Sequence, residues 1–145
     1  MKLRAIKVNS ARSEQGGWVK DIAGFPGVRL LVRGFESEAF KLALSRRQLA
    51  VTNDDREDGK PGGAVKPKVT ERLFGLAMAD AILLDWDGIE GEDDQPIPYS
   101  RELAEQYLTD PDFRLFREAV ALAGTLVESE TDARVEAALG NSPAA

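Results

Sequence analysis

The chain has 145 residues, of which 43% are hydrophobic and 30% are charged, and its formal net charge is -6. It contains no cysteine and no histidine, which excludes disulfides, thiolate nucleophiles, histidine general bases and the usual zinc ligands. A chain of this size can bury a substantial core without covalent staples. It has no apolar run of signal-peptide or membrane-span length, so we expect a cytoplasmic protein that does not enter a membrane.

Charge is unevenly distributed along the chain. Residues 1–50 carry 10 Lys/Arg against 4 Asp/Glu, whereas residues 85–145 carry 4 against 15. Such a split indicates a basic surface for an acidic partner, two ends that attract each other, or ordinary solvated charge. The sequence pI of about 4.8 and the lack of interleaved aromatic residues disfavour nucleic-acid binding. If nucleic acid is not the partner, the arginines of the N-terminal part would keep the outer face of a small sheet soluble.

Three short strands are predicted near the N-terminus. Residues 3–8 and 18–22 are strand candidates, and residues 28–33 form the strongest one because apolar and basic side chains largely alternate there. Turn-forming residues at 23–27 predict an antiparallel hairpin between the second and third strands. The three strands would form a small meander.

One helix is predicted to follow this meander. Ser37 is placed to cap a helix over residues 38–50, with Phe40, Ala43, Leu44 and Leu49 on its buried side. Residues 54–63 contain no apolar side chain, which favours a flexible linker or loop over residues 52–68.

The rest of the chain is predicted to be helical. Thr70 is expected to open a helix over residues 71–86 that is apolar on nearly every face, so it is either central to the core or covered by a partner. Ser100 is a cap candidate for a helix over residues 101–108. A third, weak helix is predicted over residues 131–139.

The longest amphipathic stripe begins after Asp110-Pro111, a cap followed by a proline at the first helical position. Apolar side chains then recur at three- and four-residue spacing, which predicts about four helical turns. These side chains are Phe113, Phe116, Val120, Ala123 and Val127.

We therefore predict an α+β fold, with a small N-terminal antiparallel β-meander of about three strands plus a helix, followed by an all-helical C-terminal part. The predicted divisions are residues 1–51, the linker 52–68, the helical part 69–140 and a frayed tail 141–145. The two parts are either separate domains or one compact domain.

An acidic stretch around residues 85–94 raises the question of a calcium site. In an EF-hand register that starts at Asp85, the fifth position is Ile89, the sixth is Glu90 and the twelfth is Pro96, so the required ligands and glycine are missing. No Walker phosphate loop is present, and no motif brings nucleophile and base together. We therefore predict no metal, no cofactor and no catalytic residue; a carboxylate enzyme would need a pocket with a strongly perturbed acid.

Several segments together resemble the tail assembly chaperones of long-tailed, siphovirus-like bacteriophages. The resemblance lies in Trp18-Val19 with its turn, the strand ending in Arg33-Gly34, and the three later segments 83–88, 96–100 and 108–113. It covers roughly residues 15–125, and none of its motifs is catalytic.

The resemblance implies a non-enzymatic assembly factor in the host bacterial cytoplasm. Proteins of that family bind the tape measure protein, keep it soluble and help recruit tail tube protein. For the present chain, a homo-oligomer is a further expected partner. The alternative is a structural virion component, such as a tail or head–tail connector subunit. An apolar groove between helices would suit a helical client. The residues predicted to bind a partner are Trp86, Tyr99, Leu103, Tyr107, Phe113, Phe116 and Val120.

Overall fold

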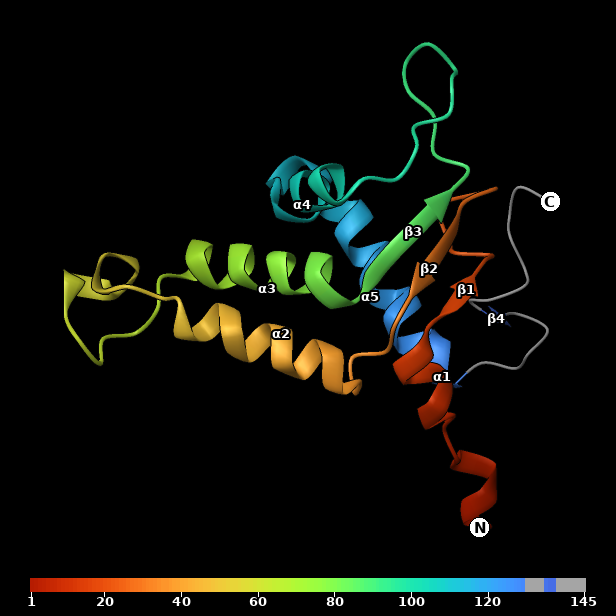
Figure 1. Ribbon diagram of the computed structural model, residues 1–145, viewed down its shortest axis with the longest axis horizontal. Helices are drawn as coiled ribbons and strands as arrows, with labels where there is room; N and C mark the ends of the chain where they lie inside the picture. Colours follow the sequence, from red (N-terminus) through yellow and green to blue (C-terminus); the bar gives the residue numbers. More distant parts are fainter. Residues whose placement is uncertain (130–134, 138–145) are drawn as a thin grey trace.

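A computed structural model describes residues 1–129 and 135–137 of the chain. It contains one antiparallel sheet with helices packed on and beside it, which confirms the predicted α+β class (Figure 1). The C-terminal part is mainly helical, as expected, but it also supplies two strands of the sheet.

The sheet has the strand order β3-β2-β1-β4, and every neighbouring pair is antiparallel. Its strands are β1 Gly17–Val19, β2 Arg29–Val32, β3 Leu83–Asp87 and β4 Val135–Ala137. The predicted hairpin between the second and third strands is confirmed as the β1–β2 pair. A β-bulge lies at Leu84, because Leu31 pairs with Asp85 whereas Val32 pairs with Leu83.

The core lies between this sheet and helix α5 (Arg114–Ser129), which packs against β1 and β2. Val28, Leu30 and Val32 are buried, as their alternation predicts. The stripe on α5 is confirmed from its second member onward, since it is buried at Phe116, Val120, Ala123 and Val127.

The described residues form four further α-helices. They are α1 (Ser10–Gln15), α2 (Glu38–Leu49), α3 (Pro67–Ala81) and α4 (Arg101–Thr109). Helix α3 is flanked by α2 on one side and α4 on the other, which explains why so many of its faces are apolar (Figure 1). Short 3₁₀ turns cover Leu3–Ile6, Asn53–Asp55, Glu57–Gly59 and Pro111–Phe113.

The three predicted caps are confirmed. The hydroxyl of Ser37 accepts a hydrogen bond from the amide of Phe40 at 3.2 Å, and that of Ser100 accepts one from Leu103 at 3.0 Å. Asp110 caps the Pro111–Phe113 turn by accepting from the amide of Asp112 at 2.9 Å. Each cap depends only on neighbours within three residues, so local sequence is enough to predict it.

The predicted strand at residues 3–8 is wrong. Leu3–Ile6 is a 3₁₀ turn that extends away from the body of the molecule, with Leu3 and Ile6 exposed (Figure 1). Within the described sheet, both edges of β1 are occupied, by β2 and by β4, so no neighbouring strand is available to this segment.

The predicted helix over residues 71–86 is wrong at both ends. It begins at Pro67 rather than after Thr70, with the proline at its first position, and it ends at Ala81. Trp86 therefore lies in β3 and does not close a helix. A short apolar run is compatible with either a helix or a strand. Residues 83–87 form a strand because they pair with β2.

The remaining differences are smaller. Residues 135–137 of the predicted third helix form strand β4, and its other residues and the tail at 141–145 lie outside the described residues. Leu49 is exposed at the end of α2 instead of buried. In the predicted linker, Arg56 forms an isolated antiparallel bridge with Val65. The division into domains stays a prediction.

Candidate functional site

Five of the seven predicted partner-binding residues gather in one place. Trp86 from β3 contacts Tyr99, Tyr107 and Phe116, with ring centroids 5.1, 5.8 and 6.0 Å away. Tyr107 from α4 also contacts Phe113, at 4.9 Å between centroids. We call these five rings the aromatic cluster. Tertiary folding thus unites side chains from a strand, two helices and the loops between them.

Hydrogen bonds fix the cluster in position. The indole Nε1 of Trp86 donates to the carbonyl of Ile97 at 2.7 Å, and the hydroxyl of Tyr99 donates to the carbonyl of Leu83 at 3.4 Å. Burial raises the pKa of the Tyr99 phenol; Arg101 opposes this shift and Asp85 adds to it. The phenol is therefore neutral at ordinary pH and serves as an anchor.

Exposure separates the members of this group. Trp86, Phe116 and Val120 are buried, whereas Tyr99, Tyr107 and the neighbouring Leu103 are half-buried. Phe113 is 40% exposed. A partner on this surface would touch Phe113 and the edge of Tyr107, while the buried side chains hold them from beneath.

A second apolar surface lies between α5 and the segment that joins β1 to β2. A hollow of about 320 Å³ is lined by the segment before β2 and by one face of the helix. We call it the α5 groove, and its lining residues are Ile22, Ala23, Gly24, Phe25, Leu115, Glu118, Ala119 and Leu122. Phe25 connects it to the aromatic cluster, because its ring lies 6.5 Å from that of Phe116.

Sequence reasoning missed the leucines of this groove. Leu115 is 64% exposed and Leu122 is 42% exposed. They recur with Ala119 at four- and three-residue spacing, so α5 carries a second apolar stripe beside the buried one. This second stripe was visible in the sequence but was not predicted as a separate face. The one acidic residue that lines the groove is Glu118, whose Oε1 lies 3.6 Å from the Nε of Arg114.

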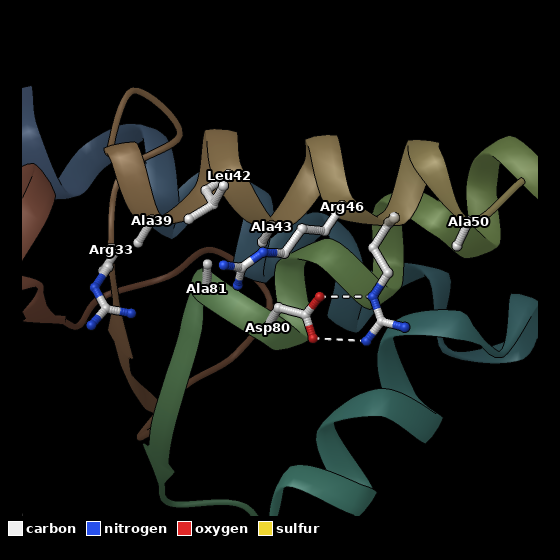
Figure 2. A pocket seen from close by; sticks show the side chains of 9 residues that line it. Arg33, Ala39, Leu42, Ala43, Arg46, Ala50, Asp80 and Ala81 are labelled. Atoms are coloured by element: carbon white, nitrogen blue, oxygen red, sulfur yellow. Dashed lines mark hydrogen bonds and ion pairs between the residues drawn. The ribbon is translucent and has the colours of Figure 1, made fainter.

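A second hollow, of about 540 Å³, lies between α2 and the end of α3 (Figure 2). Its floor is formed by small apolar side chains, and arginines surround it. We call it the arginine groove, and it is lined by Arg33, Ala39, Leu42, Ala43, Arg46, Arg47, Ala50, Asp80 and Ala81.

One acidic side chain in the arginine groove is held by two arginines. Arg47 donates two hydrogen bonds to the Asp80 carboxylate, both 2.8 Å long, and Arg101 also donates to it (Figure 2 marks the Arg47 pair). Burial alone would raise the pKa of Asp80, but these two guanidinium groups outweigh it and hold the pKa below its ordinary value. Asp80 is therefore a structural anion and not an acid poised for catalysis.

The described residues contain no group of three metal-ligating side chains. No helix in this part of the chain is long and apolar enough to span a bilayer.

A family model described as YdaY prophage protein matches residues 35–141, well over half of the chain. The chain belongs to this prophage family. It is thus phage-derived, as the resemblance to phage proteins implied. The match begins just before α2 and includes the helices that line both grooves. Comparison with curated proteins and with solved structures returned no match.

Proposed function

We propose that this prophage protein is a non-enzymatic tail assembly chaperone that acts in the host cytoplasm. It would bind the tape measure protein, keep it soluble and help recruit tail tube subunits. Membership of a prophage family supports a role in phage biology. The observation that carries the proposal is the α5 groove, where two leucines remain exposed beside an apolar hollow.

A long apolar helix is the kind of client that such a groove fits. Amphipathic helices commonly bind by laying one apolar face into a groove, and each leucine fully buried in this way contributes about 1.5–3 kcal/mol. Leu115 and Leu122 lie two turns apart on α5, with Ala119 between them as a small residue that allows close approach.

Co-expression with the tape measure candidate of the same prophage tests this proposal. The wild-type chain should bring the client into the soluble fraction and co-elute with it in size-exclusion chromatography. The variant Leu115→Glu/Leu122→Glu should lower the amount of soluble client by at least about tenfold, because the lost apolar burial exceeds about 1.4 kcal/mol.

A matched control replaces two exposed leucines elsewhere. Leu3 and Leu49 are 76% and 84% exposed and do not line the α5 groove. The variant Leu3→Glu/Leu49→Glu should therefore keep the client soluble. Client that still aggregates with the wild-type chain would refute the chaperone role, and equal loss in both variants would refute the groove as the binding site.

The alternative function is a structural virion component, and the phage origin of the family is equally compatible with it. Mass spectrometry of purified particles distinguishes the two. A chaperone should be absent from the particle, whereas a tail or connector subunit should be present in many copies.

A further inference from the structure

An acidic loop projects from the molecule between β3 and α4. Figure 1 shows residues 88–97 extending away from the body as a narrow loop. It contains no lysine or arginine, and four of its acidic side chains are exposed: Glu90, Glu92, Asp93 and Asp94. Within the described residues, no ion pair joins these carboxylates to a cation. We call this loop the acidic hairpin.

The acidic hairpin is ordered by its own hydrogen bonds. The amide of Ile97 donates to Ile89 at 2.8 Å, and that of Gly91 donates to Gln95 at 2.9 Å. The carboxylate of Asp93 accepts from the amide of Gln95 at 3.1 Å. Its base is tied to the core by the bond from Trp86 to the carbonyl of Ile97. Little conformational entropy would therefore be lost when the hairpin binds.

The arginine groove has the opposite charge. Its lining contains three arginines and one aspartate, so its formal net charge is +2. The aspartate is already bound by Arg47 and Arg101. Arg33 uses its Nε to donate to the carbonyl of Glu14 at 3.0 Å. Arg46 is exposed, forms no ion pair among the described residues, and extends over the middle of the hollow toward Asp80 and Ala81 (Figure 2).

The two features cannot meet within one molecule. The acidic hairpin projects beyond α4, whereas the groove lies along α2, on the other side of α3 (Figure 1). Residues 90–94 carry a formal charge of -4, from four acids and no base, against +2 in the groove. Guanidinium groups bind carboxylates with two parallel hydrogen bonds, so the chemistry of the two surfaces matches as well as their charge.

We propose that the arginine groove binds the acidic hairpin of a second copy of the chain. The contact is head-to-tail, so each pair still presents one open groove and one open hairpin. Contacts of this type extend into rings or open rows. This inference goes beyond the chaperone function and does not rest on it. The phosphate backbone of a nucleic acid is the competing ligand for the three arginines, but the protein's net charge of -6 opposes the binding of a polyanion.

Charge reversal on each surface gives the test. The groove variant is Leu42→Glu/Arg46→Glu and the hairpin variant is Glu90→Lys/Glu92→Lys; all four positions are exposed. Sedimentation velocity should show concentration-dependent association of the wild type at about 0.05 M salt and its loss at about 0.5 M, because salt screens exposed charges. Each variant alone should associate at least about tenfold more weakly, since like charges then face each other.

An equimolar mixture of the two variants is the decisive sample. The hairpin variant retains a normal groove and the groove variant retains a normal hairpin, so one complementary contact is restored and heterodimers should form. The control Glu71→Lys/Glu102→Lys changes two exposed acids elsewhere and should associate like the wild type. Circular dichroism verifies that each variant is folded.

Several outcomes would overturn the proposal. They are a wild type that stays monomeric at low salt, association that survives in either variant, and a mixture that does not regain it. Wild-type binding to a double-stranded oligonucleotide at low salt, lost in the groove variant, would assign the arginines to phosphate instead.

Discussion

Asp80 shows how one carboxylate holds together parts of the chain that are distant in sequence. It comes from α3 and binds Arg47 of α2 and Arg101 of α4. Its side chain is 21% exposed, so these bonds are partly protected from water. Charge-assisted bonds in such a setting contribute more than fully exposed pairs.

The variant Asp80→Asn should lower the free energy of unfolding by about 1 kcal/mol at neutral pH. Because the folded-state pKa of Asp80 lies below its unfolded value, this stabilisation is present above about pH 4. It is lost as pH falls through the folded-state pKa, when wild-type Asp80 also becomes neutral. Urea denaturation at a series of pH values measures the difference in the free energy of unfolding between the wild type and Asp80→Asn. A difference that persists unchanged at acidic pH would contradict the stabilising role of the Asp80 carboxylate.

At the scale of elements, the close packing of α3 against α4 depends on Gly75. A Cβ atom at this position would lie 2.2 Å from the carbonyl oxygen of Leu108, which is backbone and cannot move aside. In an isolated helix, alanine is favoured over glycine by about 0.8–1 kcal/mol. Here that preference should be reversed.

We expect Gly75→Ala to destabilise the fold by about 1–3 kcal/mol, the usual cost of overpacking, because the two helices must separate. Thermal or chemical denaturation gives the value, and Glu71→Ala on an exposed position of the same helix serves as the control. A stabilising Gly75→Ala would show that the helices are farther apart than described.

Sequence patterns predicted those elements whose signals are local. Ser37 and Ser100 each cap a helix through an amide three residues away, and the stripe from Phe116 to Val127 follows helical spacing. Residues 83–86 were predicted as the end of a helix, because the strand conformation of Leu83–Asp87 depends on pairing with β2, which lies about 50 residues earlier in the chain.

The candidate site was predictable to a similar extent. The large aromatic side chains were predicted to bind a partner, and the structure brings five of them together, while the binding of a partner stays a prediction. The α5 groove was not predicted, because only the stripe of α5 that faces the core was considered. Leu115 and Leu122 lie outside that stripe. The arginine groove requires Arg33 and α2 to meet Asp80, which only the tertiary structure specifies.

At the scale of the whole molecule, strand β3 joins the two parts of the chain. It pairs with β2 and contributes Trp86 to the core between sheet and helices. We therefore expect the N-terminal part and the helical C-terminal part of the chain to unfold together in one transition. Far-UV circular dichroism and the fluorescence of Trp18 and Trp86 should give coincident denaturation curves. Two separated transitions would instead support independent domains.

The bulge at Leu84 and the hydrogen bonds of β3 also limit how copies of the protein can join. Strand β3 is at the edge of the sheet, yet the amide of Trp86 donates to the Asp85 carboxylate and the carbonyl of Leu83 accepts from Tyr99. Backbone groups satisfied by side chains, beside an irregular register, make a poor template for an incoming strand. This edge therefore resists sheet-to-sheet growth, so a second copy that approaches β3 would have to bind through side-chain surfaces.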